Sequence, residues 1–188
     1  MKNWIKTHST GYTILILFAL SSSIYVMMLT VTIPKVVELS GGMKILDMLP
    51  TGYSPEYVNS LMSNLGPEGR HAYLFYQLPL DMVYPALFGL SNCLIIAYFL
   101  RKLNRLEGRF ISLCYLPLLA GIFDYCENLG IISILKTFPQ NPETLSQITN
   151  VFSISKSLLT TISLSTIIIL LLIWGFRKFF LKTGTVVK

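Results

Sequence analysis

The chain has 188 residues, of which 53% are hydrophobic and only 13% are charged. A soluble domain carries about 25% charged residues, so the composition excludes an ordinary soluble domain and indicates a membrane protein. The net charge of +6 does not indicate a nucleic-acid partner, because the basic residues gather beside apolar segments. No spacing of cysteine and histidine predicts a metal site, and no cofactor is expected.

Four apolar segments follow one another along the chain, and we expect helices at about residues 12–33, 72–100, 110–135 and 142–176. Each exceeds the ~20 residues that a helix needs to cross a bilayer. The predicted fold is all-α, an integral membrane four-helix bundle in which residues 1–188 form a single domain. The first segment is too long for the apolar part of a cleaved signal peptide.

Positive charge is sorted between the two ends of the predicted bundle. Basic residues near helix ends resist translocation, so this pattern predicts that both termini are cytoplasmic. The expected membrane is the plasma (inner) membrane if the protein is bacterial, and the endoplasmic reticulum if it is eukaryotic. The basic residues on the predicted inner side are Lys2, Lys6, Arg101, Lys102, Arg105, Arg109, Arg177, Lys178, Lys182 and Lys188.

The first outer loop is expected to contain a short amphipathic helix at about residues 55–65. Ser54 is a suitable N-cap, Pro55 suits the first helical position, and Glu56 favours the positive start of the helix. Gly66 and the proline after it would end the helix. Its apolar face either lies on the membrane surface or closes as a lid over an outward-facing cavity, and amphipathicity alone does not separate these alternatives.

The second outer loop carries a similar start signal for the fourth helix. Asn141 is the expected N-cap, Pro142 would occupy the first helical position, and Glu143 follows it. We therefore expect this helix to begin before the membrane and to run unbroken to Phe176.

Three of the predicted helices carry polar side chains at the same depth in the membrane. Asp124, Glu127 and Asn128 share one face of the third helix, because residues three and four apart are neighbours on a helix. Asp81 of the second helix and Lys156 of the fourth lie at a similar depth by the rise of a helix. A charge near the bilayer centre costs at least ~2.5–3.5 kcal/mol, so these side chains must face the interior of the bundle.

Two prolines in the second helix favour a pocket at this depth. Pro85 leaves the carbonyl of Asp81 without its helical hydrogen bond, and Pro79 does the same to Phe75. Such carbonyls at membrane depth are tolerated only inside protein or beside a wet cavity. The candidate catalytic residues are therefore Asp81, Asp124 and Glu127. The candidate ligand-binding residues are Arg70, Gln77, Tyr84, Tyr125, Asn128, Lys156 and Thr160.

The same residues also allow a purely structural interpretation. Lys156 would pair with Glu127, and Arg70 with Asp81, so that the pairs lock the helices together. Three acids against one deep cation fit this interpretation less well, because acids so close together cannot all ionise cheaply. Carboxyls held in this way inside a cavity are candidates for function.

The stretches "YQLPLDMVYP" in the second helix and "PETL" before the fourth, together with the architecture, resemble the EXPERA membrane family. That family contains the emopamil-binding sterol isomerases and the sigma-2 receptor. The resemblance implies four helices, cytosolic termini, and a site for sterols or amphiphilic amines built from intramembrane acids. The first helix here has no acid, and Tyr73 stands where the sigma-2 branch has a glutamate, so no particular ligand or reaction is carried over.

We expect a protein that binds a lipid-like or cationic amphiphilic ligand in an outer-leaflet pocket lined by buried acids. One alternative is an intramembrane acid–base enzyme, an isomerase or cyclase acting on a lipid. Another is an accessory subunit whose buried charges are structural. Proton-coupled transport is disfavoured, because four helices lack the paired halves of many transporters. The expected partner is a membrane lipid or small amphiphile, and a homodimer or larger membrane complex stays open.

The charge pattern yields a topology prediction. Tags at both termini should be accessible only from the cytoplasm, and a tag near Gly41 only from outside, because the basic flanks stay inside. Labelling of intact cells with a membrane-impermeant reagent measures this. A C-terminal tag labelled from outside would contradict the orientation.

Overall fold

The computed structural model describes residues 2–107, 109–140 and 142–180, and within them the regular structure is helical. Four helical stretches are long and apolar enough to cross a membrane. The prediction of an all-helical protein with four such helices is confirmed. The stretches are Gly11–Leu39, Pro55–Lys102, Arg109–Thr137 and Glu143–Phe179.

The first stretch consists of α2 (Gly11–Met27), a π-helical turn (Met28–Thr32) and α3 (Ile33–Leu39). The expected end at residue 33 is therefore wrong. Pro34 lies in the first turn of α3, where the missing N–H removes no hydrogen bond of that helix. A proline placed after a π turn thus does not stop the helical run.

The second stretch consists of α4 (Pro55–Ala72), a π-helical turn (Tyr73–Gln77) and α5 (Leu78–Lys102). Gly66 kinks α4, with a φ of 59° and a ψ of −174°. Only glycine adopts this backbone conformation at little cost. Helical structure nevertheless resumes directly after the kink. The second membrane helix, expected at residues 72–100, therefore begins well before residue 72.

The third stretch begins with a 3₁₀ helix (Arg109–Tyr115) and continues as α6 (Leu116–Thr137). The fourth is a single long helix, α7 (Glu143–Phe180), which passes the expected end at residue 176. Asn141, the expected N-cap of α7, lies outside the described residues, as do the basic residues of the segment 181–188.

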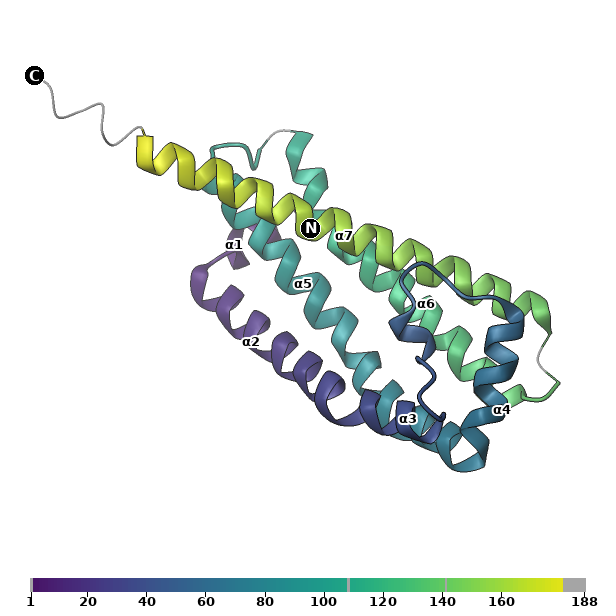
Figure 1. Cartoon of the computed structure of the whole chain (residues 1–188). Coiled ribbons are helices and arrows are strands. Elements are labelled where there is room, and N and C mark those ends of the chain that lie inside the picture. The colour runs from purple at the N-terminus through teal and green to yellow at the C-terminus, as the bar shows by residue number, and fades with distance from the viewer. Residues whose placement is uncertain (1, 108, 141, 181–188) are drawn as a thin grey trace, which may run out of the picture.

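A short N-terminal helix, α1 (Lys2–His8), was not expected from the sequence. Ile5 is fully buried among apolar residues of α5, α6 and α7 or the turns beside them. Lys6 forms a salt bridge with Glu107 of the loop between α5 and the third stretch, with 2.6 Å between Nζ and Oε1. Figure 1 shows α1 at one end of the bundle and α3 and α4 at the other. We call these the α1 end and the α4 end.

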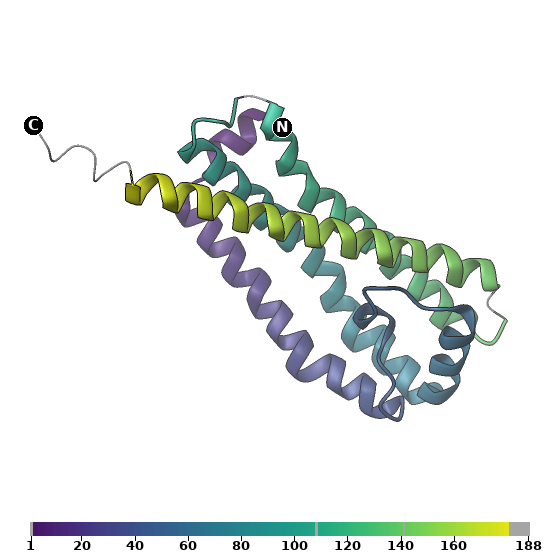
Figure 2. The same ribbon diagram turned by 45° about the horizontal axis from the view of Figure 1, so that its top comes forward.

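Helix α5 is central in the packing. It contacts α2, α6 and α7, and α6 also packs along α7. Figure 2 shows α7 crossing in front of α5 and α2 running beside α5 along the edge of the bundle. Most of the exposed large apolar side chains belong to α2 and α7, as expected for surfaces that face lipid tails.

The apolar side of α4 belongs to the protein core. Together with Ile45 and Leu46 of the preceding loop, it packs against α3 and the end of α6. Both of these loop residues are fully buried, so the loop itself is part of the α4 end. The buried residues of the first part of α4 are Val58, Leu61, Met62 and Leu65.

Candidate functional site

Lys156 of α7 is enclosed by two carboxyl groups of α6. Its Nζ lies 3.1 Å from Oδ1 of Asp124 and 2.5 Å from Oε2 of Glu127. The two acids are three residues apart, so they occupy adjacent turns and face α7 together. The exposed fraction is 0% for the Glu127 side chain, 10% for Asp124 and 15% for Lys156. The predicted pair of Lys156 with Glu127 is confirmed, and Asp124 extends it to a group of three.

Asn128 joins α6 to α5 at the proline of α5. Its Nδ2 donates a hydrogen bond of 2.9 Å to the carbonyl oxygen of Asp81. Pro85 lacks the N–H that would otherwise bond this carbonyl, so the buried amide supplies the missing donor. Gly121 allows the helices to approach here, because a Cβ at that position would lie 2.9 Å from the carbonyl oxygen of Pro85. The conformation of α5 around Asp81 is thereby tied to α6.

Asp47, from the first outer loop, brings a fourth acid to this layer. It lies in a 3₁₀ turn (Leu46–Met48), and the hydroxyl of the fully buried Tyr73 donates to its Oδ2 at 2.8 Å. Burial raises the pKa of Asp47, and the charge of Lys156 and the hydrogen bond from Tyr73 oppose this only in part. Asp47 was not predicted to belong to the site, because acids in loops are usually exposed. The apolar neighbours of this acid in "KILDML" were the available signal.

A pocket of about 390 Å³ opens beside these groups at the α4 end. Its walls come from α2 and the π turn after it, the first outer loop, α5, α6 and α7. The structure therefore brings a large part of the predicted site together on one cavity. The predicted residues that line it are Gln77, Asp81, Tyr84, Asp124, Lys156 and Thr160.

Four predicted site residues, on α4 and α6, do not line the pocket, and Arg70 is the clearest case. Its Nη1 donates to the carbonyl oxygen of Met62 at 2.7 Å, and its guanidinium lies 4.9 Å from the ring centre of Phe138. It forms no salt bridge with Asp81, so that predicted pair is wrong. Arg70 instead fastens the two parts of α4 to each other and to the end of α6.

Glu127 and Asn128 are fully buried next to the pocket and act on it through the side chains and backbone that they hold. Tyr125 is not among the lining residues and is only partly buried. It precedes Cys126 on α6, on a different face from Asp124 and Asn128. Glu127 and Asn128 therefore position groups of the pocket, whereas Tyr125 lies away from it.

Two carboxyl groups that line the pocket each keep an oxygen that accepts no hydrogen bond from a donor group of the described residues. These buried atoms are Oδ2 of Asp81 and Oδ1 of Asp47, and the two carboxyl groups lie within hydrogen-bond reach of each other. Neither acid forms a salt bridge within that part of the chain, since Lys156 pairs with the two acids of α6. A buried polar atom without a partner is costly and calls for an explanation, such as a proton or a bound ligand.

Aromatic rings form one wall of the pocket. Tyr84 of α5 stacks on Tyr25 of α2, with ring centres 5.5 Å apart, and lies 5.6 Å from the ring of Phe88. Tyr25 is 44% exposed, so this wall reaches the outer surface of the bundle. The pocket therefore has acids inside and an aromatic edge toward the membrane.

The two π turns meet at the inner wall of the pocket. Thr32, at the end of the first π turn, donates to Oε1 of Gln77, at the end of the second. The other amide atom of Gln77, Nε2, lies 3.7 Å from the sulfur of Met28. π turns are frequent at functional sites, and here both of them aim side chains at one cavity.

The chain was compared with protein-family models, curated proteins and solved structures, and nothing matches. The resemblance to the EXPERA family therefore stays a prediction. Among the described residues, no three or more histidine, cysteine, aspartate or glutamate side chains are grouped so that they could hold a metal ion.

The group of three charges yields a stability prediction. Lys156→Met should lower the free energy of unfolding by ~3–5 kcal/mol, because it leaves two buried carboxyls without their counter-charge. Adding Asp124→Asn and Glu127→Gln to that variant should restore most of the loss. Reversible unfolding in mixed micelles measures both effects. Lys136→Met, at an exposed position of α6, is the control and should change little. A stable Lys156→Met protein would show that the ion pairs do not hold α7.

Proposed function

We propose that the protein binds a cationic amphiphile, whose positively charged head enters the pocket between Asp47 and Asp81. The observation that carries this proposal is the pair of neighbouring buried carboxyl oxygens that accept no hydrogen bond from a donor group of the described residues. Both acids line the same cavity. A ligand ammonium would give each oxygen a charged hydrogen-bond donor.

The balance of charge at the pocket supports the same ligand. Four carboxyl groups, those of Asp47, Asp81, Asp124 and Glu127, lie around the one ammonium of Lys156. Lys156 is engaged by the two acids of α6. An added cation would relieve the repulsion among the acids, and burial would strengthen its attraction to them.

The apolar part of the ligand has a matching surface. The rings of Tyr25, Tyr84 and Phe88 offer both apolar contact and attraction for a cation at their faces. A cavity of about 390 Å³ is in the range that holds small ligands. A hydrocarbon chain would leave the pocket past Tyr25, between α2 and α7, and continue among the lipid tails.

The predicted topology sets the side of the membrane. With both termini cytoplasmic, the α1 end faces the cytoplasm and the pocket opens in the outer leaflet. The resemblance to the EXPERA family, in which intramembrane acids bind amphiphilic amines, supports the same class of ligand.

An acid–base enzyme is the second candidate, and one observation favours it. Asp124 is held in a salt bridge, whereas Asp81 in the same pocket has none within the described residues. Two carboxyls in unlike settings can divide the roles of proton acceptor and proton donor. A purely structural accessory subunit accounts for the pairs of Lys156, but not for Asp47 and Asp81, two neighbouring buried acids that form no salt bridge within the described residues.

Binding of N,N-dimethyldodecylamine tests the proposal. The protein in nanodiscs of phosphatidylcholine should bind this amine, and Asp81→Asn should weaken binding at least about tenfold, because it removes a charge that contacts the head. Thermal stability of the variant should stay equal or rise, since repulsion among the acids falls. Glu38→Gln, at an exposed acid of the α4 end, is the control and should bind as the parent does.

The neutral analogue 1-dodecanol separates charge recognition from apolar partition. It should compete poorly with the amine. Equal binding of both compounds, or an Asp81→Asn variant that binds the amine as well as the parent, would refute the proposal. Turnover of a lipid that depends on both Asp81 and Asp124 would instead establish the enzyme.

Asp47→Asn gives a prediction of pH dependence. The pKa of Asp47 is raised in the folded protein, so ionising it costs stability at any pH above its unfolded value of about 3.9. Asparagine removes this cost and keeps the oxygen that accepts from Tyr73. The variant should therefore unfold at a higher temperature than the parent at pH 7, and the difference should shrink toward pH 4. A variant that is less stable at pH 7 would contradict the raised pKa.

A further inference from the structure

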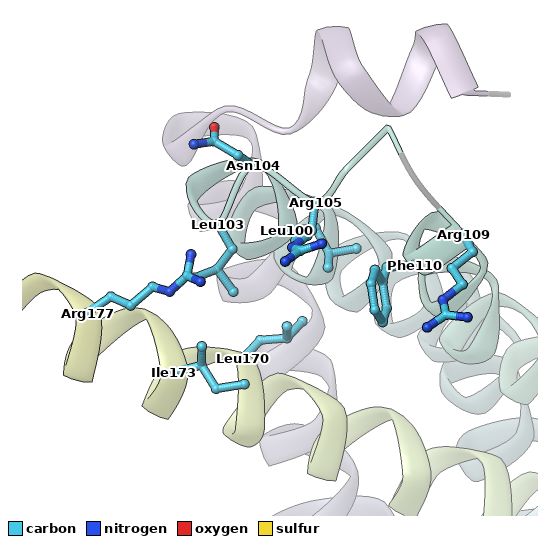
Figure 3. Close-up of a pocket in the computed structure, with 9 residues that line it drawn as sticks. All are labelled: Leu100, Leu103, Asn104, Arg105, Arg109, Phe110, Leu170, Ile173 and Arg177. Carbon is cyan, nitrogen blue, oxygen red and sulfur yellow. The ribbon is translucent and has the colours of Figure 1, made fainter.

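A second pocket lies at the α1 end, far along the bundle from the acids. Its volume is about 650 Å³, and its lining consists of five apolar side chains, one asparagine and three arginines. Figure 3 shows the arginines Arg105, Arg109 and Arg177 placed around the apolar side chains. This pocket has no acidic residue in its lining, so its chemistry is the reverse of that at the α4 end.

The three arginines come from separate parts of the chain. Arg109 opens the 3₁₀ helix before α6, and Arg177 lies in the last turns of α7. Arg105 comes directly after the turn that ends α5. Its backbone N–H bonds the carbonyl of Leu100 at 2.8 Å, while Asn104 has a φ of 57°. This is a Schellman motif with asparagine in the left-handed position, and it fixes where the chain leaves the helix.

The three arginines differ from Lys6 and Lys156 in that no acid of the described chain pairs with them. None of the three forms a salt bridge within the described residues. The nearest acid in the sequence, Glu107, pairs with Lys6, and this contact lowers the pKa of Glu107. Arg109 lies over the ring of Phe110, with 5.4 Å between the guanidinium carbon and the ring centre. Three guanidinium groups therefore line one cavity, and no described residue supplies them with an anion.

Positive charge at this end is expected from topology alone, but its arrangement is not. Lys102 and Lys178 are equally basic and equally exposed neighbours, yet they lie over the rings of Tyr98 and Trp174 and do not line the pocket. Among the basic residues described at this end, only Arg105, Arg109 and Arg177 line the cavity. Arginine is suited to this role because its planar group binds phosphate oxygens in pairs.

The floor of the pocket indicates what kind of anion fits. Leu170 and Ile173 of α7 and Leu100 of α5 make it apolar. On α7 the floor continues into side chains that face the membrane, among them Ile169 and Leu172, which are 55% and 65% exposed. A small soluble anion needs no such surface, whereas a lipid has a charged head next to hydrocarbon chains.

We propose that this pocket binds an anionic phospholipid, with its phosphate between Arg105, Arg109 and Arg177 and an acyl chain along the floor. Basic pockets between membrane helices near the cytoplasmic surface are suited to such headgroups. The predicted topology puts the α1 end in that leaflet. The site is independent of the amine pocket and does not rest on the function proposed for it.

Binding of dihexanoylphosphatidylglycerol tests the proposal. Native mass spectrometry and thermal unfolding of the protein in a neutral detergent should show that this lipid binds and stabilises, whereas dihexanoylphosphatidylcholine does so far less. The variant Arg109→Gln with Arg177→Gln should bind phosphatidylglycerol at least tenfold more weakly. Both arginines are exposed, so the fold does not depend on them.

A matched control removes the same charge from the same end of the bundle. Lys102→Gln with Lys178→Gln should change binding less than twofold. An equal loss in this control would show only general attraction to positive charge, and would overturn the site. If inorganic phosphate stabilises the parent protein to the same extent as phosphatidylglycerol, the ligand is a small anion and the proposed lipid is wrong.

One further variant tests the acyl chain. Ile173→Trp fills the floor without changing charge, and Ile173 is 44% exposed, so the larger ring is tolerated. It should weaken binding of phosphatidylglycerol several-fold. Unchanged binding in this variant would contradict the placement of the chain along α7.

Discussion

The ammonium of Lys156, held between Asp124 and Glu127, is the interaction on which the rest of the arrangement depends. Lipid tails are as apolar as leucine, so apolar contact alone gives membrane helices little reason to associate. The ion pairs fix α7 to α6 at one depth. From there Asn128 holds the backbone of α5, and Gln77 reaches Thr32 in the first helical stretch. A single layer of buried polar contacts therefore links all four stretches.

Much of this layer could be predicted from the sequence. The length of the apolar segments is enough to identify four spans, and the rise of a helix is enough to match the depths of Asp81, Glu127 and Lys156. The role of Pro85 could also be predicted from local chemistry. In a helix, a proline has no N–H, so the carbonyl four residues earlier loses its hydrogen bond. What Asn128 does with that carbonyl depends on how close α5 and α6 come, which the side-chain-free Gly121 decides.

The misplaced residues show where such reasoning ends. Arg70 was predicted to pair with Asp81, but the π turn between them changes the number of residues per turn, and Arg70 bonds the carbonyl of Met62 instead. Asp47 reaches the pocket because its loop folds back into the bundle, and no periodic pattern in the sequence predicts such a loop. α1 is equally hidden, since its docking rests on one buried isoleucine, one exposed ion pair and hydrogen bonds from Arg101 to the carbonyls of Lys6 and Ser9.

The order of the charges along the chain has a consequence for biosynthesis. Asp47, Asp81, Asp124 and Glu127 all precede Lys156, the cation that neutralises the acids of α6. During translation, α6 therefore leaves the ribosome before its counter-charge does. Its carboxyls have to stay protonated, or in contact with the insertion machinery, until α7 emerges from the ribosome. The last helix to be synthesised is thus the one that completes assembly, and a nascent chain that stops short of it exposes uncompensated acids to cellular quality control.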